Sequence, residues 1–305
     1  GNTVFNAGDS VVHIGAAASK FLSNHVYNGG LFITDVGLMN AHNSGDVEGS
    51  EVAWNWVHDN RAIHDPARSW NGGVGIRYDS GLCELGCSNY SIHHNIVWNA
   101  PRGAISLWAL LPSQVNSGNA KIKAYNNTCA DQIHISSNGS AAGIDVRNNI
   151  AIRFKNYNPD MTGATLSNNL LIESPFAENL DGSPGFVSAI NRNYQLNQGS
   201  RAVDSGVRIP PFTDGFVGAQ PDMGALERGK KPFIAGAMVL ESDVSGMTVR
   251  YEPTVDGNAR FVVTGLPVGR SLPLTTRLRI GTTTASNTFA HRYDFTSHVA
   301  EVVFT

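Results

Sequence analysis

An asparagine beside a short apolar segment recurs along the first half of the chain. The recurring residues are Asn24, Asn55, Asn95, Asn127, Asn149 and Asn169, and neighbours lie about 20 to 40 residues apart. Repeats of this length are typical of solenoid architectures. The shortest repeat has room for three short strands and tight turns, and successive coils would stack about 4.8 Å apart. The repeat therefore predicts a parallel β-helix.

The recurring asparagine predicts a corner of each coil. Asparagine tolerates turn and left-handed backbone conformations, and stacked asparagine side chains can hydrogen-bond to one another along a column. We expect Asn95, in the middle of the series, to be at least partly buried in such a ladder. The alternative is that scattered asparagines merely mark loops, although here the apolar context repeats with them.

Composition excludes two broad classes of function. The net charge is −3 and Lys and Arg do not cluster, which gives no electrostatic case for binding nucleic acid. No apolar run approaches the roughly 18 residues that a membrane-spanning helix needs. Only 15% of the residues are charged and 32 are glycine, which suits a turn-rich β protein. Strand patterns begin at once, so we expect the parent protein to extend upstream of Gly1.

The three cysteines suggest the compartment. Cys83 and Cys87 flank a short loop, which favours a disulfide and hence a secreted, extracellular or cell-surface protein. A zinc site is the alternative, although no second CxxC pair supplies the further ligands. Cys129 falls at a corner of the repeat, where we expect it to be a small buried hydrophobic residue.

Two sets of predicted strands accompany the asparagine corners. The first set covers residues 51–55, 91–95, 121–126, 143–147 and 164–167, and the second covers 37–40, 75–79, 104–108 and 133–136. The second set alternates with a period of two, which predicts a parallel sheet with one buried face. We expect Ile76 and Tyr78 to share the buried register of Ile105 and Leu107.

The repeat ends near Pro210, where two short motifs follow. Residues 200–206 read Ser-Arg-Ala-Val-Asp-Ser-Gly, and residues 221–227 read Pro-Asp-Met-Gly-Ala-Leu-Glu. This pair resembles the closing coil of the right-handed parallel β-helix proteins of the pectate-lyase-like superfamily of polysaccharide lyases and glycoside hydrolases. The resemblance covers residues 1–228. It implies a right-handed parallel β-helix in a carbohydrate-active protein, and it is poorly specific for the reaction.

The sequence changes character after the Gly-Lys-Lys-Pro at residues 229–232. Residues 233–240, 247–252, 259–264, 275–280, 289–295 and 299–304 alternate like antiparallel strands separated by turn residues. We therefore divide the chain into a β-helix domain, residues 1–228, and a small β-sandwich domain, residues 229–305. The second domain is either a cap for the solenoid or a carbohydrate-binding module. The sequence of this domain shows no evident group of aromatic residues on which a sugar could stack, so nothing favours the carbohydrate-binding module.

The longest repeats predict where function lies. They fall between Asn24 and Asn127, and loops on a rigid scaffold commonly carry the functional groups. The longest insertion, residues 59–70, ends at Trp70 and adds charges and histidines over this half of the chain. We expect it to roof a binding groove.

Alternation predicts which side chains of the second strand set face outward. One row holds Arg77, Ser106 and His134, and a second holds Asp79, Trp108 and Ser136. An indole can stack on the C–H face of a sugar, and charged groups pair with its hydroxyl or carboxylate groups. We expect the residues that bind a saccharide in an exposed groove to be Arg77, Trp108, His134, Trp70 and Arg102. The alternative for Asp79 is that it caps a turn.

Carboxylates are concentrated in the same part of the chain. They are Asp35, Asp46, Glu48, Glu51, Asp59 and Asp79. Hydrolysis of a glycosidic bond uses two carboxyl groups, about 5 Å apart for retention or roughly 6.5–9.5 Å apart for inversion. We expect Asp79, Asp35 and Glu48 to be the catalytic groups of a glycoside hydrolase that needs no cofactor or metal. For any single acid, a solvated loop position is the alternative.

β-Elimination from a uronic acid sugar, by a polysaccharide lyase or epimerase, is the competing chemistry. It needs a base near C5 and a cation, either Ca²⁺ or Arg, to neutralise the sugar carboxylate. The candidates are Arg77, Arg102, His94, His134 and Lys123. The predicted groove lacks the Lys-Arg pairing of Ca²⁺-dependent alginate and chondroitin lyases, which favours the hydrolase. His93 and His94 make a poor metal site, because adjacent strand residues point to opposite faces.

The sequence thus predicts a secreted all-β protein, a right-handed parallel β-helix followed by a β-sandwich, that degrades a polysaccharide or oligosaccharide. The second alternative to hydrolysis, besides elimination, is a non-enzymatic glycan-binding or structural surface protein. No pattern in the sequence identifies the sugar or the linkage.

Overall fold

The computed structural model divides the chain into two compact units, Gly1–Gly236 and Ala237–Thr305. The structure describes residues 1–42, 47–63, 72–79, 89–109, 122–137, 141, 143–156, 163–173 and 178–236, together with 242–244, 247–253, 259–264, 275–279 and 299–303. The sequence alone places the change of character slightly earlier, at residue 229.

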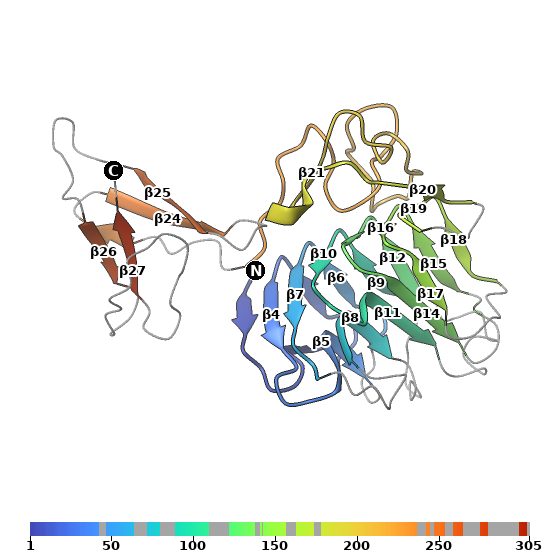
Figure 1. Cartoon of the computed structure of the whole chain (residues 1–305), viewed down its shortest axis with the longest axis horizontal. Helices are drawn as coiled ribbons and strands as arrows, with labels where there is room; N and C mark the ends of the chain where they lie inside the picture. Colours follow the sequence, from blue (N-terminus) through green and yellow to red (C-terminus); the bar gives the residue numbers. More distant parts are fainter. Residues whose placement is uncertain are drawn as a thin grey trace. The chain divides into compact units, whose positions relative to one another are not determined.

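Three stacked parallel sheets form the first unit (Figure 1). Sheet A contains β1 (Thr3–Phe5), β4 (His25–Gly29), β7 (Trp56–Asn60), β10 (Ile96–Trp98), β13 (Thr128–Cys129), β16 (Ile150–Ala151), β19 (Leu170–Leu171) and β20 (Leu180–Asp181). Sheet B contains β2 (Val12–His13), β5 (Asp35–His42), β8 (Gly72–Asp79), β11 (Gly103–Ala109), β14 (Ile133–Ser137) and β17 (Phe154–Asn156). Sheet C contains β3 (Lys20–Leu22), β6 (Glu51–Ala53), β9 (Tyr90–His93), β12 (Ile122–Tyr125), β15 (Ile144–Arg147) and β18 (Thr165–Ser167).

Each coil contributes its strands in the order C, A, B before the next coil begins. This all-β arrangement is consistent with the β-helix solenoid that the repeat predicts. The two predicted strand sets correspond to sheets C and B, and sheet A follows each corner asparagine directly.

The interior of the coils is filled by alternate side chains of every strand. Val26 and Val57 are in register in sheet A, and Ile76 is in register with Ile105 in sheet B. All four are fully buried members of one apolar cluster, which also contains Tyr78 and the other core residues of the sheets. The predicted inward register of sheet B is therefore confirmed.

The corner asparagines form a continuous hydrogen-bonded ladder. In each step, the side-chain oxygen of one asparagine accepts hydrogen bonds from the backbone N–H and the side-chain amide of the asparagine one coil earlier. Asn55 donates to Asn95 at 3.0 and 2.9 Å, and Asn95 donates to Asn127 at 3.0 Å in both bonds. Asn95 has no exposed surface. The ladder is confirmed, and it extends at its two ends to Asn2 and Asn179, which the repeat did not identify.

A second column explains why the corner turns so sharply. The residue before each of the six corner asparagines of the repeat has a positive φ angle, between 48° and 58°: Ser23, Trp54, His94, Asn126, Asn148 and Asn168. Left-handed backbone geometry at this residue turns the chain sharply from sheet C into sheet A. This geometry costs non-glycine residues some strain. The ladder hydrogen bonds at the next residue hold the turn in place.

Residues 200–236, here called the return segment, run back along this corner. Gly224 donates its backbone N–H to the carbonyl of Asn148 at 2.7 Å, and Ala225 donates to the Thr128 hydroxyl at 2.9 Å. Gly236 reaches the first coils, where its N–H bonds to the carbonyl of Ser23 at 2.7 Å. In Figure 1 the yellow and orange part of the first unit lies along one side of the stacked coils. The motifs at 200–206 and 221–227 therefore belong to a cover rather than to a further three-strand coil.

The return segment buries the outer face of sheet A. Ile150 and Leu170, which point out of the coil, pack with Leu196, Ala202 and Met223 in a second apolar cluster. The hairpin of β21 (Phe186–Ser188) and β22 (Asn193–Leu196), joined by the short helix η1 (Ala189–Asn191), lies at the start of this cover. Sheet A is consequently covered on both faces.

The second unit contains two antiparallel sheets. One has the order β23 (Ser242–Val244), β24 (Met247–Pro253) and β25 (Ala259–Thr264), and the other pairs β26 (Thr275–Arg279) with β27 (Val299–Val303). Four of the strands predicted in this unit, those beginning at residues 247, 259, 275 and 299, match observed strands. The predicted strand at 289–295 lies outside the described residues.

Three further predictions, on one strand and on the cysteines, can be compared with the structure. The predicted strand beginning at residue 233 is wrong over 233–236, because Phe233 belongs to the irregular return segment. The ring centroids of Phe233 and Trp56 lie 6.4 Å apart. Cys129 is buried and unbridged, as expected. Cys83 and Cys87 lie outside the described residues, so their disulfide stays a prediction.

Candidate functional site

Sheet B carries a row of polar side chains on its outer face. The register aligns Asn40, Arg77, Ser106, His134 and Lys155 on successive strands. A second row aligns Asp79, Trp108 and Ser136. The two predicted rows are thus present, and they lie opposite the buried register of Ile76 and Tyr78.

An ion-pair network joins four of the predicted residues on this face. The Arg77 guanidinium donates to Asp79 at 2.7 Å and to Asp35 at 3.0 Å. Arg102 donates to the same Asp35 oxygen at 2.8 Å. Asp35 begins β5, Arg77 and Asp79 end β8, and Arg102 precedes β11, so three successive coils contribute. The structure therefore brings together two candidate acids and two candidate cations.

The shared guanidinium fixes the distance between the two acids. Because Asp35 and Asp79 are both hydrogen-bonded to terminal nitrogens of Arg77, their bonded oxygens lie no more than about 8 Å apart. Carboxyl groups that hydrolyse glycosides lie about 5 Å or roughly 6.5–9.5 Å apart. The separation is compatible with this chemistry.

The expectation that these rows stand open to solvent is wrong for most of their members. Arg77 and Asp79 are each 5% exposed and His134 is 1% exposed, whereas Trp108 and Ser106 are partly exposed. Two glycines leave space beside these side chains. A Cβ atom on Gly37 would come within 2.5 Å of the Arg77 Cβ atom, and one on Gly103 within 3.1 Å of the His134 ring. Alternation predicts the side of the sheet but not this burial.

Burial also determines the charge state of His134. Burial lowers its pKa to about 3, and the positive charges of Lys155, Arg102 and Arg153 act in the same direction. The imidazole is neutral at pH 7, so it can accept or donate a hydrogen bond but cannot serve as a cationic ligand for a substrate carboxylate.

The remaining candidates lie elsewhere. Glu48 is exposed in the connection between β5 and β6. Glu51 pairs with His93 on sheet C, and Lys123 donates to Asn89 beside the same sheet. Trp70 and Asp46 lie outside the described residues. The described site is therefore smaller than the one that the sequence predicts.

Sequence reasoning missed a chain of buried imidazoles on the outer face of sheet A. Asp59 accepts a hydrogen bond from His58 Nδ1 at 2.9 Å, and His58 Nε2 lies 2.8 Å from His25 Nε2. The His58 ring is stacked between Tyr27 at 5.0 Å and Trp98 at 4.1 Å. Burial lowers the pKa of His25 to about 3, so the His25 imidazole is neutral at pH 7. Part of the signal was available, because Tyr27, His58 and Trp98 share one register position on successive repeats, although His25 is aligned with Trp56 instead.

No group of three or more potential metal-ligating side chains occurs within the described residues. Nor does that part of the chain contain a helix with the length and apolar character to cross a membrane. Comparison with protein-family models, with curated proteins and with solved structures finds no match to the chain.

Proposed function

We propose that this protein is an extracellular enzyme that hydrolyses a polysaccharide or oligosaccharide on the outer face of sheet B. The observation that carries the proposal is the pairing of Asp35 and Asp79 through Arg77, beside the partly exposed indole of Trp108. A glycosidase needs two carboxyl groups at about this separation, and an aromatic ring beside them can stack on the sugar.

The surroundings of the two carboxylates differ, as an acid and a base require. Asp35 accepts hydrogen bonds from both Arg77 and Arg102 and is partly exposed, whereas Asp79 accepts a hydrogen bond from Arg77 and is buried. In the free protein Arg77 is hydrogen-bonded to both Asp35 and Asp79. A sugar hydroxyl that binds Arg77 would take the place of one carboxylate and release it for chemistry.

One observation favours elimination as a second candidate function. The guanidinium groups of Arg77 and Arg102 converge on a single oxygen of Asp35, at 3.0 and 2.8 Å. Two converging cations would equally neutralise the carboxylate of a uronic acid, which lowers the barrier to removing the C5 proton. On this alternative the protein is a polysaccharide lyase or epimerase that needs no Ca²⁺, because arginine supplies the charge.

Product analysis on a broad glycan panel separates the candidates. New reducing ends without an unsaturated product indicate hydrolysis, and unsaturated products that absorb ultraviolet light indicate elimination. Absence of either product on every glycan, with glycan binding retained, would show a non-enzymatic binding protein and contradict the proposal.

Matched variants then locate the chemistry. Asp35→Asn and Asp79→Asn should each lower turnover by about 10²- to 10⁴-fold if the carboxyl groups transfer protons or attack. Asp145→Asn is the control, because Asp145 also pairs with an arginine, Arg147, but on sheet C. Thermal melts of all three proteins are needed, since Asp79 is buried. A control variant as inactive as the two site variants would argue against a site on sheet B.

Finer features of the fold belong to the same proposal. We propose that the coils wind in the right-handed sense and that the antiparallel sheets of the second unit form a β-sandwich. The resemblance of residues 200–206 and 221–227 to the closing coil of pectate-lyase-like proteins supports the first. The predicted Cys83–Cys87 disulfide supports export.

A further inference from the structure

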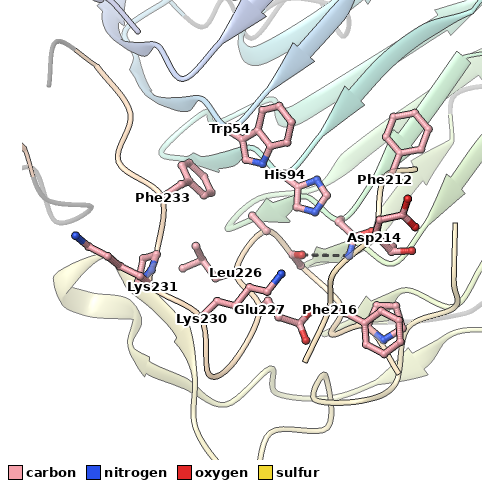
Figure 2. A pocket seen from close by; sticks show the side chains of 16 residues that line it. Trp54, His94, Phe212, Asp214, Phe216, Leu226, Glu227, Lys230, Lys231 and Phe233 are labelled. Carbon is pink, nitrogen blue, oxygen red and sulfur yellow. Dashed lines mark hydrogen bonds between the residues drawn. The ribbon is translucent and has the colours of Figure 1, made fainter. Parts of the chain in front are cut away.

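A pocket of about 290 Å³ lies between the corner of sheets C and A and the return segment (Figure 2). Trp54 and His94 come from the left-handed corner column, and Phe212, Lys230 and Phe233 come from the return segment. This volume is near the lower limit of about 300 Å³ for small-molecule sites, so it holds one ring-sized group. It is on a different side of the coil from the sheet B site.

Much of the pocket wall is aromatic. The indole of Trp54, which is partly exposed, and the rings of Phe212, Phe216 and Phe233 surround the space, with Leu226 beside them. The corner geometry explains the position of Trp54, since its φ angle of 55° directs the side chain out of the coil. Aromatic faces suit the C–H face of a sugar ring or another flat ring.

Three charged groups of the lining have no ion-pair partner among the described residues: Lys230, Lys231 and Asp214, all exposed. Figure 2 shows the Lys230 side chain between Leu226 and Glu227 with its amine near the middle of the pocket, whereas the Lys231 side chain extends away from the labelled rings. Glu227, also in the lining, is already occupied, because its carboxylate accepts the backbone N–H groups of Val217 and Asp222 at 3.0 Å each. The pocket therefore has one cation available to an anionic ligand.

His94 adds a hydrogen-bond acceptor. His93 Nε2 lies 3.0 Å from Glu51 and must donate to that carboxylate, which leaves His93 Nδ1 as an acceptor. His94 Nδ1, 3.0 Å away, then donates to it. The left-handed turn at His94 makes this contact possible, so the expectation that the two rings point to opposite faces is wrong. His94 Nε2 is left unprotonated, and burial lowers the His94 pKa to about 3, which keeps it so.

We propose that this pocket binds a uronic acid residue of a glycan, separately from the sheet B site. The ring would lie on Trp54 and the phenylalanines, its carboxylate would pair with Lys230, and a hydroxyl would donate to His94 or Asp214. A neutral sugar would leave Lys230 without its anion, and an aromatic acid would leave the acceptors His94 and Asp214 without donors. The commitment to a sugar acid rests on this combination of one cation, two acceptors and apolar walls.

Calorimetric titration of the full chain with methyl glucuronoside tests the proposal, with methyl glucoside and benzoate as comparison ligands. The glucuronoside should bind at least about tenfold more tightly than either. Lys230→Gln should abolish the preference over the neutral glucoside, whereas Lys20→Gln, which removes the same charge from an exposed position on sheet C, should preserve it. Trp54→Ala should weaken both sugars together.

Three outcomes would overturn the proposal: no measurable glucuronoside binding, equal binding of benzoate, or an unchanged preference in Lys230→Gln. Lys230 is exposed, so its substitution should not unfold the protein even if Trp54→Ala does. The readout is binding rather than turnover. A negative binding result at this pocket therefore does not contradict the proposed enzymatic function. A negative activity result at sheet B likewise does not contradict binding at this pocket.

Discussion

Sheets A and B are built from the same coils, yet their outer faces differ completely. On sheet A the outward positions of successive strands include Trp56, Ile150 and Leu170, all of them buried beneath the return segment. On sheet B the outward positions carry Arg77, Asp79 and other polar groups. A β-helix must only fill its interior to fold, so outward residues are free to serve either as a docking face for the chain itself or as a site. The polar character of sheet B favours the second use.

Removing an aromatic anchor from sheet A should have the largest effect. Trp56 is 1% exposed and packs against His25 and Phe233. Trp56→Ala should lower the free energy of unfolding by about 3–5 kcal/mol, because it leaves a large cavity under the return segment. Urea denaturation measures this change. The folded variant should retain glycan cleavage, and a selective loss of activity would place the site on the wrong face.

The ladder should be the next most sensitive element. Asn95→Ala removes bonds to Asn127, to Asn55 and to the backbone carbonyls of Val52 and His93. We expect a loss of at least about 1–3 kcal/mol in unfolding free energy, because the buried partners are left unsatisfied. Asn99→Ala is the matched control, since Asn99 is exposed outside the ladder. Equal losses in the two variants would refute a structural role for the stacked column.

Trp108 offers the direct counterpart of Trp56 on the opposite sheet. It is partly exposed on the outer face of sheet B, in register with Asp79. Trp108→Ala should weaken glycan binding by about 1–2 kcal/mol, through the lost stacking contact, and should reduce stability by less than Trp56→Ala does. Dissociation constants and melting curves of the two variants together make the test. The comparison fails if Trp108→Ala causes the larger loss of stability and Trp56→Ala the larger loss of glycan binding.

The imidazoles of sheet A should give the smallest effect at neutral pH, because they affect stability only as the pH is lowered. His25 has its pKa lowered from 6.5 to about 3 by burial and by the neighbouring His58. As the pH falls from 6.5 towards 3, the unfolded chain binds a proton that the folded chain does not, so stability decreases by up to about 1.4 kcal/mol per pH unit. His25→Phe should make the pH profile of the unfolding free energy flatter over this range. An identical profile would show that His25 does not titrate as the burial implies.

Sequence reasoning succeeded where one repeated rule determines the structure. The spacing of asparagines such as Asn95 predicts the ladder, and the alternation around Ile76 and Tyr78 predicts which side of sheet B carries Arg77. It failed where a contact joins parts of the chain that no repeat relates. Asp35 and Arg102 are 67 residues apart and meet only because the coils that carry them stack with one coil between them. The return segment is a similar case, since alternation at Phe233 suggests a strand but cannot reveal that Trp56 lies beneath it.

The most direct test is a crystal structure of Asp79→Asn with an oligosaccharide of the preferred glycan. The variant is chosen because it should bind the substrate without cleaving it. We expect a sugar chain on the outer face of sheet B, with one ring over Trp108 and the scissile linkage within hydrogen-bond distance of Asp35. An empty sheet B face in crystals whose ligand is bound elsewhere on the protein would contradict the central claim.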